Sequence, residues 1–524
     1  MVAKATRYDV VVVGSGFGGS ISALRLAQAG KSVLVLERGK RYRPGGFPRD
    51  VTRTDEVLWR HAERRKAQGL FDVRFLSGIG TVTASGVGGG SLIYANVHVR
   101  PDAEVFEDPR WPQAYRRDSL EPYFDKVARE LRLNPVPPSI PLRKRDLFQR
   151  AARGMGRETF DPPVAVAFSE PPGPGRRVCQ LCAECEFGCQ HGAKNTMDLT
   201  YLARAEALGA LVLARTLVSH VEPVREGYRV HCRDLVSGER HTVEGSRVVL
   251  AAGTLGTVEI LLRSRDVART LPRVSRRLGH GYSGNGDFLA SMQGAREDIQ
   301  PWVGPDVSTV MRFTDHQPRF TLVKATFNQP ATEVLAGLGQ PSLGRLQGLG
   351  APLWTCLGPA LHAALKKGLL SRPLRDDVDA ARTSNLFGIG QDNANGRMHL
   401  EDGQLDVSWD FAGENAELVR RMTDAMRDLA AQYGATFAPL VTWQLFKRPF
   451  TVHSLGGAHL AEAPERGVVS TEGEVFHHPG LHVADGSVIP TALGFHPVMT
   501  ISAVAERIAE AVVHGFSSHS RSAS

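Results

Sequence analysis

The sequence of 524 residues predicts an α/β protein with two parts. One is a Rossmann-like domain, in which helices cover a parallel sheet, and the other is an α+β cap domain with an antiparallel sheet. Three observations predict this fold class: a strand–turn–helix–strand unit opens the chain, a second strand–turn–helix follows near residue 250, and 300–450 has the pattern of a separate layer. A chain of this length usually forms two or more domains.

The first unit carries a glycine fingerprint. A buried strand, "YDVVVV", leads into a helix over 17–30 and then into the strand "SVLVLE". In the turn between strand and helix, Gly14 permits a tight bend, Gly16 lets the backbone approach a pyrophosphate, and Gly19 allows close helix–strand packing. Glu37 ends the second strand about twenty residues on, where an acid binds ribose hydroxyls. This combination predicts dinucleotide binding.

Two later segments indicate which dinucleotide is bound. "VVLAAGTLGTVEILL" is a further strand–turn–helix, in which Gly253 opens the helix. "VADGSVIPTALGFHPVMTISAVAER" places Asp485 at a strand end and a helix start near His496. Several distant segments that meet at one ligand predict a large, permanently held flavin, FAD, rather than NAD.

The rest of the chain divides between the two domains. Strands are expected over 211–224, 227–235, 240–253 and 319–327, and an alternating strand after the glycines of "TASGVGGGSLIYANVHV". We expect an FAD-binding domain made of 1–100, 200–290 and 451–516. The cap comprises 101–199 and 291–450 and includes the cysteine-rich segment 179–189. A disordered tail is expected at 517–524.

Composition excludes several function classes. The net charge is +8, but no dense basic helix and no basic–aromatic interleaving is present, so nucleic acid is not an expected partner. No stretch is long and apolar enough to span a bilayer, and the start leaves no room for a signal peptide, so we expect a cytoplasmic protein. The apolar, Gly/Pro-broken run at 343–370 indicates either ordinary core helices or a surface that covers an apolar substrate or rests on a membrane.

Five stretches together resemble the glucose–methanol–choline oxidoreductases, and among them the cholesterol oxidases that hold FAD non-covalently. In chain order they are "GVGGGSL", "AAGTLGTVEILLRSRD", "SGNGDFLAS", "HSLGGAHL" and "DGSVIPTALGFHPVMTISAVAER". The resemblance runs from residue 8 to about 513, and little matches over 290–380. It implies an FAD-binding Rossmann-like domain with a substrate-binding cap, and an enzyme that oxidises the CH–OH group of a hydrophobic alcohol such as a 3-hydroxysteroid.

The resemblance also implies which residues meet FAD. The ADP half would be held by Gly14, Ser15, Gly16, Gly19 and Glu37, and the adenine region would contact Val221. The pyrophosphate and flavin would be wrapped by Gly88, Gly89, Gly90 and Ser91. The ribityl chain would meet Asp485 and Gly486, and the isoalloxazine would lie near Pro497, with His453 and His496 at its N5 edge.

Alcohol oxidation needs a base for the hydroxyl proton and an acceptor for the hydride. A histidine titrates near neutrality and can take the proton, while flavin N5 takes the hydride. "TVHSLGGAHL" places His453 at a strand end before glycines, and "GFHPV" places His496 where Pro497 fixes the backbone. Two histidines at one flavin edge can share the base and hydrogen-bonding roles.

The chain departs from the cholesterol oxidase pattern at three places. His496 stands where that pattern usually has Asn, and Tyr94 replaces a flavin-facing Asn. Asn96 lies two residues further on, which on a strand would be the same face, and we assign it to the flavin. The cap glutamate that supports the steroid double-bond shift has no counterpart in "FTLVKATF", so the resemblance carries over no residue for isomerisation.

Four of the six cysteines lie in "CQLCAECEFGC". Cys179, Cys182, Cys185 and Cys189 have the C-x2-C-x2-C-x3-C spacing of bacterial ferredoxins, which predicts a [4Fe–4S] cluster. Zinc is the rival metal, although its sites more often use two separated C-x2-C pairs. Free thiols or disulfides are the remaining alternative.

The cysteine run leaves the electron acceptor open. Without a cluster the enzyme would be an oxidase that passes electrons to O2, and with one it would be a dehydrogenase that serves a carrier or quinone and acts on a non-steroid alcohol. A flavin-binding electron-transfer protein that oxidises no alcohol is the alternative from another class; the two histidines argue against it.

Overall fold

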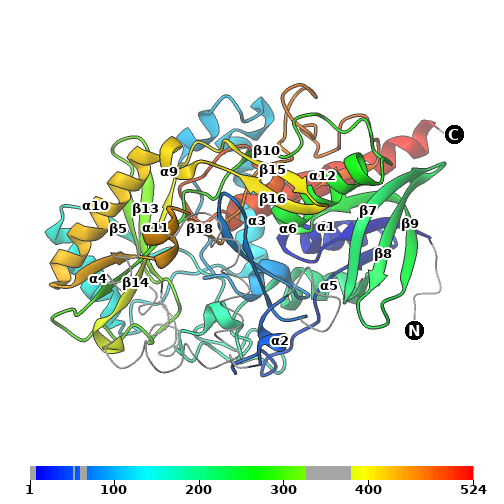
Figure 1. The fold of residues 1–524 in the computed structure, drawn as a ribbon. Helices are drawn as coiled ribbons and strands as arrows, with labels where there is room; N and C mark the ends of the chain where they lie inside the picture. The colour runs from blue at the N-terminus through cyan, green and yellow to red at the C-terminus, as the bar shows by residue number, and fades with distance from the viewer. Residues whose placement is uncertain (1–6, 51–52, 60–67, 326–378, 523–524) are drawn as a thin grey trace.

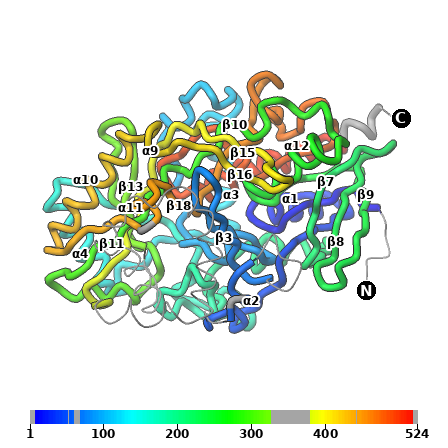
Figure 2. The backbone as a smooth tube through the Cα atoms, viewed as in Figure 1, coloured from blue at the N-terminus to red at the C-terminus, as the bar shows by residue number. Residues whose placement is uncertain are grey.

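The structure, a computed structural model, describes residues 7–50, 53–59, 68–325 and 379–522. The apolar run at 343–370 and Cys356 lie outside the described residues. The fold is mixed α/β, with a mainly parallel sheet in one half and an antiparallel sheet in the other (Figure 1). Each half is assembled from segments far apart in the sequence, as the colours in Figure 2 show.

The parallel sheet has the order β6-β2-β1-β9-β8-β7, and β19 (Leu481–Val483) also pairs with β9. Strand β1 (Arg7–Val13) lies between β2 (Val33–Leu36) and β9 (Arg240–Leu250), parallel to both, and β2 pairs with β6 (Leu211–Leu213). These strands are runs of Val and Leu because both faces of the sheet are covered. Strands β7 (Thr216–Val224) and β8 (Gly227–Asp234) extend the sheet antiparallel to β9.

Helices cover this sheet and are joined by a buried ionic network. Helix α1 (Phe17–Gln28) packs against α5 (Tyr201–Ala207) and α12 (Val498–Ser522), and α12 packs against α3 (Arg117–Leu131). Glu506 of α12 is fully buried and accepts hydrogen bonds from Arg25 at 2.6 and 2.8 Å and from the Tyr201 hydroxyl at 2.9 Å. Lys126 lies 2.9 Å from the same carboxylate. One side chain therefore ties four helices together.

The cap is built on an antiparallel sheet with the order β17-β11-β14-β13-β12-β5. Its strands are β5 (Thr159–Phe160), β11 (Phe288–Gln293), β12 (Val310–Phe313), β13 (Phe320–Ala325), β14 (Ser384–Gly390) and β17 (Thr436–Pro439). Helix α10 (Ala416–Tyr433) covers one face, and its Met422 lies so close to Gly390 that a Cβ there would be 2.3 Å from the methionine methyl. The cap helix α4 (Arg143–Gly154) contacts α10.

Two small sheets connect the halves. Strands β3 (Phe71–Phe75) and β4 (Gly80–Ala84) form a hairpin, and β18 (Phe450–Thr451) pairs parallel with β4 just before His453. The second sheet joins β10 (His280–Tyr282) to the hairpin of β15 (Gly396–Glu401) and β16 (Gln404–Ser408). Helix α6 (Gly253–Leu262) follows β9 and contacts β15.

Two sequence expectations are corrected. The expected strand after the glycines is wrong, because Gly89–Leu92 is a 3-10 helix and Asn96 has a left-handed φ of 68°, which breaks strand alternation. The expected disordered tail is wrong for 517–522, because α12 continues to Ser522. Extending an existing helix adds one hydrogen bond for each residue fixed, so a polar end can remain helical.

Candidate active site

The turn from β1 to α1 and the start of the helix need glycine at positions 14 and 19. Gly14 has φ of 97°, and a Cβ on it would lie 2.2 Å from the carbonyl oxygen of Ala251 at the end of β9. A Cβ on Gly19 would lie 2.0 Å from the carbonyl oxygen of Gly14. The helix thus starts close against the strands, with its amino end open to the space beyond them.

Glu37 organises this turn. Its Oε2 accepts hydrogen bonds from the Ser15 backbone N–H at 3.1 Å and the Ser15 hydroxyl at 2.7 Å. Its Oε1 accepts from the Gly39 N–H at 2.8 Å. The carboxylate therefore stands at the carboxyl end of β2, beside the glycine turn, as the βαβ pattern predicts.

A second glycine loop lies directly against the first. A Cβ on Gly89 would lie 2.5 Å from the Cα of Gly16, so the two loops can meet only with glycine at 89. Gly88 N–H donates to the Ser15 hydroxyl at 3.0 Å, and the Ser91 hydroxyl donates to the Gly88 carbonyl at 2.7 Å. Two Gly-rich segments that are far apart in the sequence form one cradle.

A cavity of about 790 Å³ runs from this cradle to the cap. Twelve of the residues predicted for the site line it: Gly14, Ser15, Gly16, Glu37, Gly89, Gly90, Gly253, His453, Asp485, Gly486, His496 and Pro497. Its cap side is mainly apolar and includes Leu289, Val323 and Phe387. A dinucleotide cradle and an apolar chamber thus share one space.

Five predicted residues do not line this cavity: Gly19, Gly88, Ser91, Asn96 and Val221. Val221 is buried and donates its N–H to Ser264 Oγ at 3.0 Å, while Val218 and Ser219 of the same strand line the cavity. The pairing of β7 with β8 is irregular between Val218 and His220, and such a bulge changes which residues face one side. Asn96 is fully buried, and its side-chain amide has no hydrogen-bond partner among the described residues.

Asp485 joins the last strand to the helix that Gly253 opens. Its Oδ1 accepts from the Ser487 N–H at 2.9 Å and hydroxyl at 2.6 Å, and its Oδ2 accepts from Thr257 Oγ1 at 2.5 Å. Burial raises the pKa of this carboxyl despite these donors. The sequence-predicted segments around 253 and 485 therefore do meet at the cavity wall.

The two histidines face each other at the cavity. Their ring centroids are 5.5 Å apart with an interplanar angle of 79°, and Phe387 of the cap stacks on His453 at 5.5 Å. Burial, followed by the neighbouring His453 and His98, holds the pKa of His496 well below its usual value. His496 is therefore neutral at neutral pH, and it can donate and accept hydrogen bonds but does not carry a charge.

His453 has a partner that sequence reasoning missed. Its Nδ1 lies 2.8 Å from Oδ1 of Asp287, a fully buried carboxyl directly before β11. The other oxygen of Asp287 accepts from the Thr451 hydroxyl at 2.8 Å and the Val452 N–H at 3.0 Å. Asp287 stands in "SGNGDFLAS", one of the five recognised stretches, and an acid inside such a stretch is the signal that could have identified it.

The cysteine run forms a loop beside the cavity. In the part of the chain that the structure describes, none of the four cysteines is in a disulfide. Cys185 is buried, and Glu186 and Phe187 line the cavity. Leu181 and Ala183 both have left-handed φ, of 55° and 53°, an uncommon backbone for residues with side chains. Burial, and then the nearby cysteine thiolates among other groups, raise the pKa of Cys179 to about 11.

The loop geometry does not match a zinc site. Within the described ranges, no three of these cysteine sulfurs lie within 4.8 Å of one another. Thiolates at about 2.3 Å from one zinc ion would lie under about 4 Å apart. The buried Lys194 amine donates to the carbonyls of Cys185 at 2.8 Å and Tyr94 at 2.9 Å, and so fixes the loop to the cavity wall.

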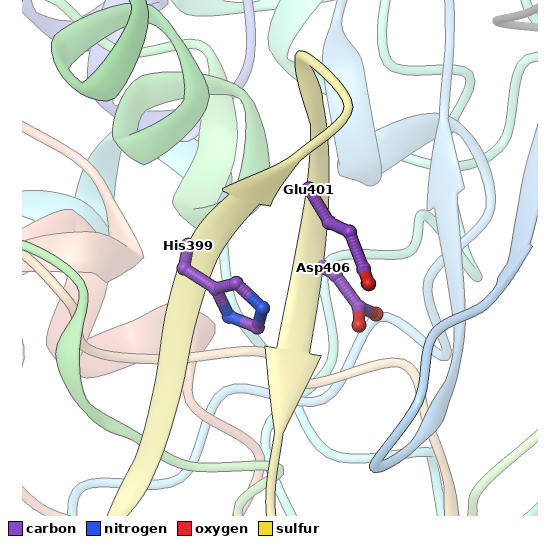
Figure 3. Close-up of side chains that lie close together, drawn as sticks. All are labelled: His399, Glu401 and Asp406. Carbon is purple, nitrogen blue, oxygen red and sulfur yellow. The ribbon is translucent and has the colours of Figure 1, made fainter. Parts of the chain in front are cut away.

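A different cluster of ligand-type side chains lies on the β15–β16 hairpin (Figure 3). One ligand atom from each of His399, Glu401 and Asp406 lies within 4.8 Å of the others, and Glu401 is exposed. Asp406 Oδ1 accepts from the Ser77 N–H at 2.8 Å. None of the three side chains lines the cavity. We assign this cluster no part in the site.

Comparison with known proteins agrees with this geometry. The family model for GMC oxidoreductase matches residues 9–280 with its N-terminal part and 392–505 with its C-terminal part. The chain belongs to the GMC oxidoreductase family. GMC oxidoreductases bind FAD, and this protein is an FAD-dependent alcohol oxidoreductase of that family.

Curated relatives of this GMC oxidoreductase cover nearly all of it. It is 30% identical to a cholesterol oxidase of Acinetobacter baumannii over 95% of this chain and 93% of the relative. It is 31% identical to a cholesterol oxidase of Mycobacterium tuberculosis over 96% and 90%. A paromamine 6'-oxidase of Streptomyces fradiae is 26% identical over 96% and 91%. The solved structure of pyridoxine 4-oxidase from "Mesorbium loti" shares the fold, with a TM-score of 0.63, 16% identity and coverage of 97% and 99%.

The residues present fit FAD. The paired glycine loops leave room for a pyrophosphate at the amino end of α1, where the helix dipole favours anions. Among the described residues no helix is long and apolar enough to cross a membrane.

Proposed function

We propose that this GMC oxidoreductase oxidises a hydrophobic secondary alcohol, and specifically a 3-hydroxysteroid such as cholesterol. The observation that carries the proposal is one cavity in which a histidine pair faces apolar cap residues. The similarity to two cholesterol oxidases over nearly the whole chain supports the steroid. The bound FAD would be held by the glycine cradle, Glu37 and the Asp485 segment, and it supplies the hydride acceptor.

The histidines divide the proton chemistry. His453, whose Nδ1 faces the carboxylate of Asp287, presents its other nitrogen to the cavity and takes the hydroxyl proton of the alcohol. His496 stays neutral and orients the hydroxyl by a hydrogen bond. The apolar walls exclude water and hold the substrate body, which keeps the carbon that loses hydride in one orientation.

The ketone product is expected without a shifted double bond. Strand β13 presents Val323 and Ala325 to the cavity, and neither is an acid. Two carboxyls, Glu186 and Asp306, line the cavity elsewhere and hydrogen-bond to one another. Ultraviolet absorbance of the product distinguishes the two outcomes, and a conjugated enone would redirect attention to Glu186.

The experiment is turnover of purified holoenzyme with a 3-hydroxysteroid and, in parallel, with a linear long-chain alcohol and an aromatic alcohol. We expect kcat/KM for the steroid to exceed that for the other two by at least tenfold, with peroxide formed mole for mole with ketone. If the enzyme oxidises the linear or aromatic alcohol but not the steroid, the steroid is not its substrate, and the proposal of alcohol oxidation stands.

A second candidate function is that of a dehydrogenase that contains a [4Fe–4S] cluster. The observation that favours it is the position of the cysteine loop, which borders the cavity and is fixed to its wall by Lys194. Cys179, Cys182, Cys185 and Cys189 would hold the cluster, and the buried ammonium groups of Lys144 and Lys194 would offset its negative charge. The cluster would supply an electron route to a carrier instead of O2.

Iron and zinc per flavin, measured on protein purified without oxygen, separate the two candidates. About four irons per flavin, lost in Cys182→Ser but kept in Cys232→Ser, would establish the dehydrogenase. The Cys232 thiol is buried on β8 and serves as the matched control. If the protein contains no iron and produces peroxide, the dehydrogenase is excluded and the enzyme is an oxidase.

A further inference from the structure

We propose that the turn Ser283–Asp287 aligns both histidines, and that Asp287 is the positioning residue that makes His453 the base. The inference rests on the proposed role of His453 in alcohol oxidation. It concerns a carboxylate that does not line the cavity and acts through the imidazole.

The first argument is the direction of the hydrogen bond. Asp287 Oδ1 lies 2.8 Å from His453 Nδ1, and a carboxylate only accepts. Nδ1 must therefore carry the hydrogen of the neutral ring, which leaves Nε2 with a free lone pair. The proton of the alcohol goes to Nε2, and the imidazolium that forms is stabilised by the buried negative charge beside it.

The second argument is that the carboxylate is held in place. Oδ2 of Asp287 accepts from the Thr451 hydroxyl at 2.8 Å and from the Val452 N–H at 3.0 Å. Both donors belong to the segment that carries His453. Three hydrogen bonds thus hold Asp287 to the segment Thr451–His453, although Asp287 and His453 are 166 positions apart in the chain.

The same turn holds the segment that precedes His496. The Asn285 amide donates to the Phe495 carbonyl at 2.8 Å and accepts from the Leu493 N–H at 2.8 Å. Asn285 has a left-handed φ of 56°, which directs its side chain within a tight turn. Contact with His496 is therefore through the backbone of its segment, whereas contact with His453 is through its ring.

The turn itself is fixed by a second buried acid. Asp392 Oδ2 accepts from the Ser283 hydroxyl at 2.8 Å and from the Gly286 N–H at 2.7 Å. Burial raises the pKa of this carboxyl to about 6. Asp392 contacts neither histidine by a hydrogen bond, so it offers a control that removes a buried acid from the same turn.

The titratable groups around His453 are few. Asp287 and His496 face its ring, His98 lies beyond His496, and Asp392 and Tyr282 lie beside Asp287. Of these, Asp287 alone makes a hydrogen bond to the ring, and it is the negative charge nearest to the imidazole. Its removal takes away the negative charge that would stabilise the positive ring formed when Nε2 accepts the proton.

The experiment is the pH dependence of kcat/KM for Asp287→Asn holoenzyme, with an alcohol that wild type oxidises. We expect kcat to fall by 10²- to 10⁴-fold, because an amide can hold the wrong tautomer, and the acid limb of the profile to move to lower pH. Asp392→Asn should move that limb less. Asn285→Gly, which tolerates the same φ, should lower kcat without moving the limb. A limb that stays in place, with kcat within threefold of wild type, overturns the proposal.

A second measurement needs no change at Asp287. In wild type labelled with ¹⁵N-histidine, the His453 signal, assigned by its loss in His453→Gln, should show a protonated Nδ1 in the neutral ring. Protonation at Nε2 instead would overturn the proposal even if Asp287→Asn fails to fold. If wild type oxidises no alcohol, or if His453→Gln is fully active, the proposed function fails first and the two failures remain distinct.

Discussion

His453 and His496 face the same cavity from two different surroundings. His453 follows β18, and its Nδ1 lies 2.8 Å from the buried carboxylate of Asp287. His496 precedes α12, and its ring neighbours, His453 and His98, are groups whose positive form lowers the pKa of His496 further. Two residues of one type at one site thus receive opposite electrostatics, and the neighbouring groups assign one to proton transfer and the other to hydrogen bonding.

Removing the imidazole rings of His453 and His496 in turn tests whether the two histidines have different roles. His453→Ala should lower kcat by at least 10²-fold, the usual scale for a positioned base. The measurement is ketone formation per bound flavin, so that loss of FAD is not counted as loss of chemistry. An activity within threefold of wild type would show that the proton leaves by another route.

His496→Asn should have a smaller effect, about tenfold in kcat. The ring is already neutral at neutral pH, and an amide retains a donor and an acceptor. The acid limb of the pH profile should therefore stay where it is in wild type. If this limb moves as far as it does in Asp287→Asn, then His496 titrates and the division of roles is wrong.

The smallest effect on catalysis is expected from the anchor of α12, the helix that follows His496. Glu506→Gln should lower the free energy of unfolding by roughly 3 kcal/mol, because Arg25 and Lys126 lose a buried partner. Bonds to Arg25 outweigh burial and lower the pKa of Glu506 in the folded state. Its stabilisation is thus present above the unfolded pKa of about 4.3 and is lost as pH falls through the folded value.

Chemical denaturation at several pH values tests this prediction. The difference between wild type and Glu506→Gln should be largest near neutral pH and should shrink below about pH 4. Glu510→Gln on the same helix is the control, because within the described ranges Glu510 accepts a single hydrogen bond, an exposed one from the Tyr123 hydroxyl at 2.8 Å. If both variants lose the same free energy of unfolding, the buried Glu506 carboxylate has no special role in stability.

The site residues that were predicted from the sequence are those whose positions a local pattern determines. The Gly14 turn, Glu37 and the Asp485 end all lie at the cavity, because a strand–turn–helix fixes such residues within a few positions. Asp287 was not predicted, because the stretch that contains it does not show that its partner is His453, 166 positions away. The resemblance implied Val221, whereas Val218 and Ser219 of the same strand line the cavity, and the irregular pairing of β7 there is not visible as a sequence pattern. Asn96 does not follow the alternation of a strand, because its backbone has a left-handed φ.

The order of the strands in the cap sheet is likewise not determined by local sequence patterns. Apart from the neighbouring strands β12 and β13, its six strands pair across large sequence distances, so their existence as a layer was predicted but their order was not. The apolar face toward the cavity follows from alternation once the order is known, with Met422 and Gly390 on the helix-covered side. Long-range pairing, rather than local propensity, decides which side chains meet the substrate.

The most direct test of the account is anaerobic mixing of holoenzyme with a 3-hydroxysteroid while flavin absorbance is followed. We predict that the flavin is reduced in a single turnover with one ketone formed per flavin, and at least 10²-fold more slowly in His453→Ala. Flavin that stays oxidised with the steroid and with other secondary alcohols, or that is reduced equally fast without His453, would contradict it.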